Sequence, residues 1–222
     1  MELSLDTASE VASIALSQEG VLEAEATWRC RRNHTVELLA AVDRLLTQTS
    51  TTKADLTAVF VSTGPGMYTG LRVGIAIAKG LAHGLALPLI GVGRLELDAY
   101  PHAAFPGRVI AVHRAGRGEL AWAAYRGSPW REETPPRLSK PEELAAQVAP
   151  PLLVVGEVDA ALAEQLAAKG AALPPASASI RRAATLAELG HQRLLRGEPS
   201  HPALLQPVYL RPPAIGPQPS GR

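Results

Sequence analysis

The segment with the clearest chemical potential is a glycine-rich turn between an apolar strand and a helix. Gly64 and Gly66 follow the apolar run 57–62, and Thr69 stands just before a stretch whose apolar residues recur at helical spacing. Such a turn can leave backbone N–H groups free at a helix N-terminus, where they bind a phosphate or another anion. The same glycines also suit a tight turn with close packing of helix on strand. The residues alone leave both interpretations open.

Asp6 is a second candidate, because it ends the first apolar strand and is followed by the hydroxyl of Thr7. A carboxylate at this position can hold a hydrated magnesium ion or orient a water molecule for phosphoryl transfer. It can equally cap the following turn through its side chain. We therefore group Asp6 with Gly64, Gly66 and Thr69 as a candidate phosphate or nucleotide loop.

The histidines and the cysteine give no support for a metal or a nucleophile. The six histidines lie at positions 34, 83, 102, 113, 191 and 201, and no two have the spacing of HxxxH or HExxH. Cys30 stands among arginines that would favour a thiolate, but the favoured interpretation is an ordinary loop thiol. A single cysteine also forms no internal disulfide and suits a reducing compartment. We predict no catalytic residue and no metal ligand.

Alternating strands and helices are expected to position these residues. The first hundred residues read β-β-β-α-β-α-β, which predicts a mixed sheet with helices packed on it. The expected strands are 2–7, 11–17, 21–28, 57–62 and 87–92, and the expected helices are 34–47 and 71–87. In the second half we expect strands at 108–113, 120–126 and 152–155 and helices at 142–148, 160–168 and 184–195. The proline pairs at 135–136, 150–151 and 174–175 are interpreted as breaks between elements.

The helix after the glycine turn carries small residues at every fourth position, namely Gly70, Gly74, Ala78 and Ala82. Each glycine inside a helix costs about 0.5–1 kcal/mol relative to alanine, so this row predicts an unusually close neighbour. The neighbour is either the chain's own sheet or a helix of another subunit. In the second case the parallel row that begins at Val73 would face the sheet.

Composition bounds the function only loosely. The 222 residues are 46% hydrophobic, which suits one large domain or two small lobes with an aliphatic core. A net charge of +1 gives no global electrostatic argument for binding nucleic acid or membranes. No secretory leader and no run of about 18 apolar residues is present, so we expect a cytoplasmic protein without a membrane partner. Residues 212–222 are expected to be a disordered tail.

Several segments resemble, in the same order, the motifs of the TsaB (YeaZ) family. They are Leu5–Ala8, His34–Leu39, Gly64–Gly74, Ala78–Ala82, Gly91-Val92 and Pro207–Arg211. The resemblance is dense over residues 1–95 and thin from there to the last motif. It implies the actin-like ATPase (ASKHA) fold, an α/β fold of two lobes, each with a mixed β-sheet flanked by helices. The first lobe is then expected at 1–100 and the second at 101–211.

The resemblance also implies a function. Family members act as non-catalytic dimerisation and scaffold subunits in forming threonylcarbamoyladenosine in tRNA, beside the anticodon. The implied partners are the TsaD transferase in a heterodimer, TsaE in the assembled complex, a second copy when the chain is alone, and tRNA indirectly. No intrinsic cofactor is implied, although a nucleotide is expected at the subunit junction. The implied partner interface comprises His34, Glu37, Leu38, Gly70, Gly74, Ala78 and Ala82.

Two alternatives from other functional classes remain open. An ATP-dependent small-molecule kinase of the same fold would need a second phosphate loop and an acidic metal site in the second lobe. A glycoprotease-type hydrolase would need a metal or a nucleophile–base pair. The chain also departs from the family pattern. Met67-Tyr68 replaces the usual Ser-Phe, and in the turn 114–121 Arg114 replaces the usual aspartate and Ala121 the usual tyrosine.

Overall fold

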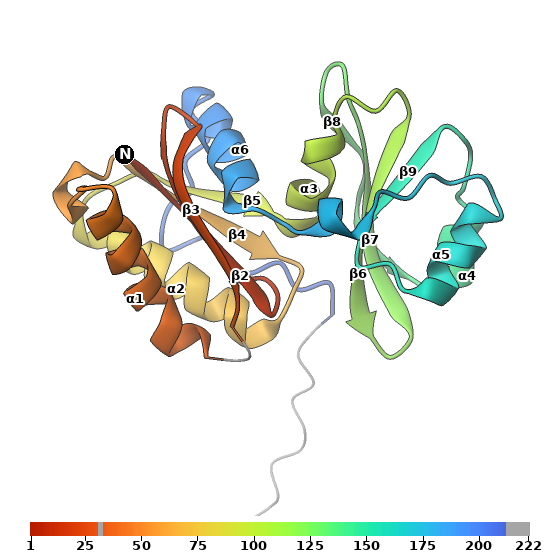
Figure 1. The fold of residues 1–222 in the computed structure, drawn as a ribbon, viewed down its shortest axis with the longest axis horizontal. Helices are drawn as coiled ribbons and strands as arrows, with labels where there is room; N and C mark the ends of the chain where they lie inside the picture. Colours follow the sequence, from red (N-terminus) through yellow and green to blue (C-terminus); the bar gives the residue numbers. More distant parts are fainter. Residues whose placement is uncertain (31–32, 212–222) are drawn as a thin grey trace, which may run out of the picture.

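Residues 1–30 and 33–211, which the computed structural model describes, form two lobes side by side (Figure 1). The first lobe holds a five-stranded sheet in the order β3-β2-β1-β4-β5, and the second a four-stranded sheet in the order β8-β7-β6-β9. The strands of the first sheet are β1 (Glu2–Asp6), β2 (Val11–Gln18), β3 (Val21–Arg29), β4 (Ala58–Gly64) and β5 (Leu89–Gly93). Those of the second are β6 (Arg108–Gly116), β7 (Glu119–Arg126), β8 (Arg131–Ser139) and β9 (Leu152–Gly156).

The first sheet is covered by helices on both faces. β1 runs antiparallel to β2 and parallel to β4, so the sheet is mixed as predicted. Because side chains alternate along a strand, Val59 and Val61 of β4 join the core beneath α1 (His34–Gln48) and α2 (Tyr68–Gly84). Phe60 faces the opposite side and packs with α6 (Ala183–Leu195).

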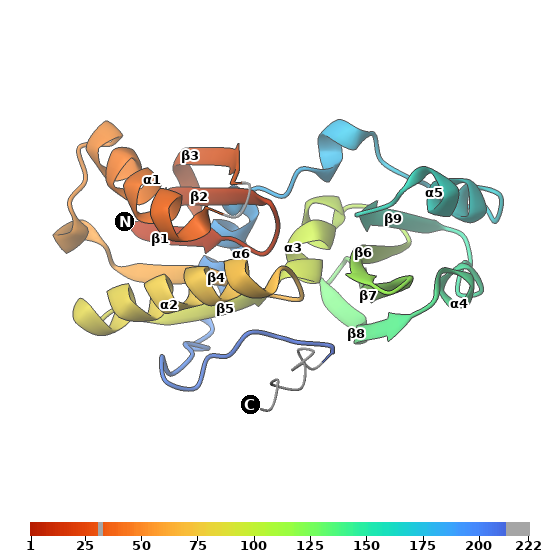
Figure 2. The same cartoon turned by 90° about the horizontal axis from the view of Figure 1, so that it is seen from below.

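The second sheet also has two covered faces. α4 (Pro141–Ala145) and α5 (Ala160–Ala167) share one core with it, and α3 (Arg94–Ala99) packs on the other face. α3 also contacts β4 and β5, so it lies between the two lobes (Figure 2). Short 3₁₀ turns at Lys53–Asp55, Tyr100–His102 and Ala176–Ser179 complete the connections.

The structure corrects three expectations from the sequence. Pro135-Pro136 lies within β8 rather than at a break; β8 is an edge strand, where missing N–H donors are tolerated. The short helix α3 was not expected at all. The second lobe does not extend to residue 211, because α6 packs on the first sheet and the N–H of Ser200 bonds to Leu89 of β5.

The remaining expectations about overall organisation have simple outcomes. The expected positions of the other long helices and of the first five strands are confirmed to within a few residues. The expected tail, residues 212–222, lies outside the described part of the chain. Within residues 1–30 and 33–211, no helix has both the length and the hydropathy of a membrane span.

Candidate functional site

The glycine turn packs directly on the hairpin between β1 and β2. Gly64 has a φ of +98°, in the left-handed region that glycine adopts without strain. A Cβ on Gly66 would collide with the carbonyl oxygen of Ala8, and that same oxygen accepts the N–H of Met67 at 2.9 Å. Close packing of backbone on backbone therefore explains these glycines, and anion binding at Gly64, Gly66 and Thr69 stays a prediction.

The row of small residues on α2 faces the chain's own sheet and hairpin. A Cβ on Gly70 would collide with the carbonyl oxygen of Thr7, and one on Gly74 would collide with the Thr7 hydroxyl. Thr7 donates that hydroxyl to the carbonyl of Gly70 at 2.7 Å. Ala78 and Ala82 are buried in the core beneath α2. The prediction that these four residues contact a partner is wrong, because they have almost no accessible surface.

Two of the three predicted interface residues on α1 are also internal. His34 is buried with its Nε2 at 3.1 Å from the carbonyl oxygen of Ser9, and Leu38 belongs to the core. Glu37 is half-buried and accepts a hydrogen bond from Trp28 Nε1 at 2.8 Å, which ties α1 to β3. An interface role for Glu37 therefore stays a prediction, whereas His34 and Leu38 are buried in the chain's own core.

The outer sides of α1 and α2 nevertheless expose apolar surface. The two helices lie side by side on one face of the first sheet (Figure 2). Val36 is 78% exposed and Leu39 is 47% exposed. Apart from the neighbouring backbone of α2 itself, no atom of the described residues lies within 4 Å of where a Cβ on Gly80 would stand. We define the α1–α2 face as the exposed residues Val36, Leu39, Ala40, Ala76 and Gly80. Exposed apolar residues on two helices that pack against each other form a candidate protein-binding surface.

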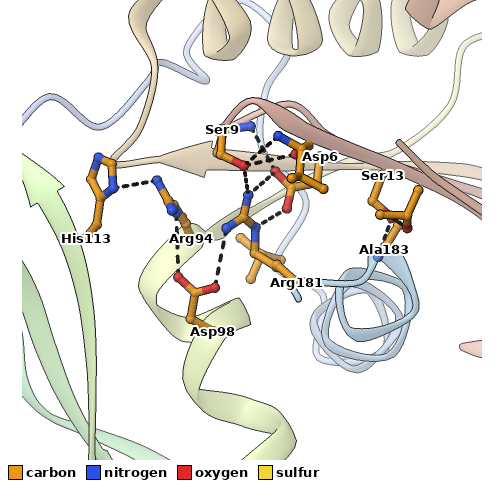
Figure 3. Close-up of polar contacts among 12 residues, drawn as sticks. Asp6, Ser9, Ser13, Arg94, Asp98, His113, Arg181 and Ala183 are labelled. Carbon is orange, nitrogen blue, oxygen red and sulfur yellow. Dashed lines mark hydrogen bonds and ion pairs between the residues drawn. The ribbon is translucent and has the colours of Figure 1, made fainter. Parts of the chain in front are cut away.

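Asp6 is engaged from two sides by groups of its own chain (Figure 3). Its Oδ1 accepts the N–H of Ala8 at 2.9 Å, which is the turn-capping role considered from the sequence. Its Oδ2 accepts from Arg181 Nε. The Arg181 guanidinium also donates to Ser9 Oγ at 3.0 Å and to Asp98 Oδ1 at 3.3 Å. Burial lowers the pKa of Arg181, but the charges of Asp6 and Asp98 outweigh it and raise that pKa, so the guanidinium stays charged.

A second buried arginine extends this cluster into the second lobe (Figure 3). Arg94 Nε lies 3.6 Å from Asp98 Oδ2, and Arg94 Nη2 donates to Glu157 Oε1 at 2.5 Å. His113 Nδ1 lies within hydrogen-bond distance of both Arg94 Nη1 and Glu157 Oε2. One ring nitrogen cannot both accept and donate, so only one of these bonds forms at a time. Burial raises the pKa of Glu157, but the His113 bond and the Arg94 charge outweigh it and lower that pKa well below its ordinary value.

Sequence reasoning found Asp6 but missed the arginines and carboxylates around it. Arg94, Asp98, Glu157 and Arg181 come from three segments, and Arg181 is 175 positions away from Asp6. No local spacing links such distant residues, and α3, which supplies two of them, was itself not expected. The partners of a buried charge become visible only when the lobes are placed together.

A cavity of about 370 Å³ opens where the glycine turn meets the second lobe. Its lining includes Met67 and Tyr68, the turn 114–116, and Tyr209 near the C-terminal end of the described chain. The rings of Tyr68 and Tyr209 stack with centroids 5.3 Å apart, and the Arg72 guanidinium lies 4.1 Å from the Tyr68 centroid. The two stretches that depart from the family pattern therefore meet at one place.

Two further candidates for chemistry are the thiol of Cys30 and groups of side chains that could hold a metal ion. Cys30 is fully buried, and burial together with the hydrogen bond and charge of Glu37 raises its pKa to about 11. A thiol with this raised pKa is protonated at neutral pH. Among residues 1–30 and 33–211, no three His, Cys, Asp or Glu side chains are placed to hold a metal ion.

Comparisons with known proteins agree with the fold and the motifs. The model of the TsaD family, described as tRNA N6-adenosine threonylcarbamoyltransferase, matches residues 28–168. The tRNA threonylcarbamoyladenosine biosynthesis protein TsaB of Escherichia coli (strain K12) is 33% identical over 217 residues, which cover 94% of each chain. YeaZ from Pseudomonas aeruginosa has a TM-score of 0.77 at 27% identity, covering 93% of this chain and 99% of that one.

A more distant structure is similar in fold alone. Component A of the (R)-2-hydroxyglutaryl-CoA dehydratase of Acidaminococcus fermentans has a TM-score of 0.51 at 10% identity, covering 87% of this chain and 98% of that one. The two mixed sheets, each flanked by helices, agree with the actin-like ATPase fold expected from the sequence.

Proposed function

Because this chain belongs to the TsaB family and so to the proteins of tRNA threonylcarbamoyladenosine biosynthesis, we propose that it is a non-catalytic scaffold subunit. Its role is to bind and activate the TsaD transferase through its first lobe. The proposal includes TsaE as a further member of the complex, a homodimer when the chain is alone, and contact with tRNA through the complex. It also includes a nucleotide at the subunit junction and no intrinsic cofactor.

The observation that carries the proposal is the α1–α2 face. Each of these helices buries one side in the core of its lobe and leaves an apolar outer side in solvent. Exposure of Val36 and Leu39 is costly in an isolated chain, because apolar surface in contact with water is unfavourable by about 25 cal/mol per Å². A partner helix against this face would remove that cost, and a specific interface of ordinary size buries about 1,600 Å² in total. The buried side of α2 cannot take this role.

The environment of Asp6 supports a role without phosphoryl chemistry. Both of its oxygens already accept hydrogen bonds from the chain itself, and the side chain is 1% exposed. A carboxylate that orients water or holds a hydrated metal needs a free oxygen facing the ligand. The surroundings of Asp6 therefore favour the scaffold function over the kinase alternative.

The proposal is tested by measuring binding to the TsaD of the same organism. Leu39→Asp places a charge on the α1–α2 face, and we expect it to weaken the TsaD complex at least tenfold. Leu195→Asp is the matched control, since Leu195 is also an exposed leucine on a helix, 74% accessible, on the opposite side of the first sheet. Light scattering after size exclusion and titration calorimetry measure the mass and the affinity.

Each result has a clear meaning. A heteromer with wild-type chain and with Leu195→Asp, lost with Leu39→Asp, supports the proposed interface. Equal affinity for all three chains would contradict the assignment of the α1–α2 face. Absence of any complex with wild-type chain, combined with turnover of ATP by the pure chain, would favour the kinase alternative instead.

A further inference from the structure

Between β5 and α6, within the described residues, the polypeptide crosses from the first lobe to the second and back again, and a buried ion pair joins these two crossings. The first crossing runs from β5 through α3 to the second sheet. The second runs from the turn Ala176–Ser179 to α6, which packs on the first sheet. Arg181 of the second crossing donates to Asp98 of α3 at 3.3 Å, and both side chains are at most 6% exposed.

Each crossing is also tied to one of the lobes. Arg181 binds Asp6 at the end of β1, in the first lobe. Arg94 binds Glu157, just after β9, and lies at 2.7 Å from His113 of β6, so α3 is held to the second lobe. Figure 3 shows the labelled members of this row, from Asp6 in the first lobe through Arg181, Asp98 and Arg94 to His113 in the second.

We propose that the row Asp6, Arg181, Asp98, Arg94 and Glu157 is an inter-lobe lock that holds the two lobes at one angle. Rotation of the lobes about the two crossings would separate Arg181 from either Asp6 or Asp98. Separation of a buried ion pair leaves an uncompensated charge out of water, which is strongly unfavourable. The lobes therefore move as one body, and this conclusion does not depend on the binding of TsaD.

The lock also limits what enters the cleft at this place. The cavity beside it has a volume of about 180 Å³ and is lined by Arg94, Asp98, Glu157 and Arg181. Pockets for small-molecule ligands usually have about 300–1,000 Å³. The charged groups that could meet a ligand here already neutralise one another. The structure thus closes this part of the cleft with its own side chains.

Double electron–electron resonance, which measures the distance between two spin labels, tests the lock in the full chain. Spin labels are placed at Gln48→Cys in the first lobe and Lys169→Cys in the second, both exposed positions, in a Cys30→Ala background. We expect one narrow distance distribution for the otherwise wild-type chain. Asp98→Asn keeps the shape of the side chain and leaves each of the two arginines one carboxylate partner. We expect both Asp98→Asn and Arg181→Gln to broaden the distance distribution or to add a second distance.

Arg182→Gln is the matched control. Arg182 neighbours Arg181 and forms an ion pair with Glu25, but that pair lies within the first lobe and does not join the lobes. It should leave the distribution narrow. Folded Asp98→Asn and Arg181→Gln chains with unchanged distributions, checked by near-ultraviolet circular dichroism, would overturn the proposal.

Hydrogen exchange of the unaltered chain provides a test that no folding defect can obscure. If the lobes are locked, the hydrogen bonds of α3 open only when the whole molecule unfolds. The amide exchange rates of α3 should then lie within about tenfold of those of β4. Exchange of α3 more than about a hundredfold faster than β4 would show that the crossings open independently, and the lock would be refuted.

Discussion

At the scale of single residues, the structure assigns partners to groups whose chemistry the sequence left open. Asp6 could have bound a metal ion, capped a turn, or both. In the folded chain it caps the turn through Ala8 and neutralises Arg181. Buried charges of this kind occur almost only in pairs, so an Asp at the end of a fully buried strand predicts a nearby cation. The identity of that cation depends on the fold.

Cys30 offers a direct test of an environment inferred from the structure. Its pKa, raised to about 11, means that only about one thiol in a hundred is ionised at pH 9 in the folded state. We expect the ultraviolet absorbance of the thiolate, taken as the difference between the chain and its Cys30→Ala variant, to keep rising beyond pH 9 in the folded state, whereas in a fully unfolded chain it has its midpoint near the ordinary thiol pKa of 9.0. A plateau of this absorbance below pH 8 would show that the folded chain holds a thiolate after all.

At the scale of elements, α2 has two faces with different tasks. Its small residues let the helix approach Thr7 and the hairpin, while its outer side contributes Ala76 and Gly80 to the α1–α2 face. Substitution of the small row would therefore disturb the fold of the chain itself. Loss of TsaD binding in a Gly74→Leu chain would say nothing about where the partner docks.

Two glycines of α2 should respond in opposite ways to alanine. Gly74→Ala forces a Cβ against the Thr7 hydroxyl, and we expect it to lower the free energy of unfolding by about 1–3 kcal/mol. Gly80→Ala meets no neighbour and should raise it by about 0.5–1 kcal/mol through better helix propensity. Urea unfolding followed by circular dichroism measures both.

A second substitution makes the cause of the Gly74 effect testable. Thr7→Ala removes the colliding hydroxyl, so Gly74→Ala should cost less in that background than in the wild-type chain. Additive effects of the two substitutions would show that the collision with Thr7 is not the reason for the glycine.

At the scale of the whole molecule, the exposed α1–α2 face predicts self-association when no other partner is present. We expect the pure chain to have twice the monomer mass of 23.4 kDa in light scattering at micromolar concentration, and Leu39→Asp to return it to the monomer mass. Leu195→Asp should remain dimeric. A wild-type monomer at all concentrations, or a dimer that survives Leu39→Asp, would contradict this prediction.

Much of the fold could be predicted from local patterns. Apolar residues at helical spacing located α1, whose expected range 34–47 matches the observed His34–Gln48 to within one residue. The ordered motifs around the glycine turn indicated the TsaB family and, with it, the two-lobed fold. These features are determined by residues close together in the chain, where helix and strand periods are directly visible.

The tertiary structure alone decided which side of α2 faces inward, where α6 packs, and what surrounds Asp6. Two faces of α2 could be buried as far as the sequence shows. Only the position of Thr7 beneath Gly70 and Gly74 decides that the face with the small residues is the buried one. Likewise, the chain crosses back to the first lobe before α6. This crossing brings Arg181 into contact with Asp6, which lies 175 positions away in the sequence. Such contacts depend on how whole sheets and helices are placed, and no local period of the sequence carries that information.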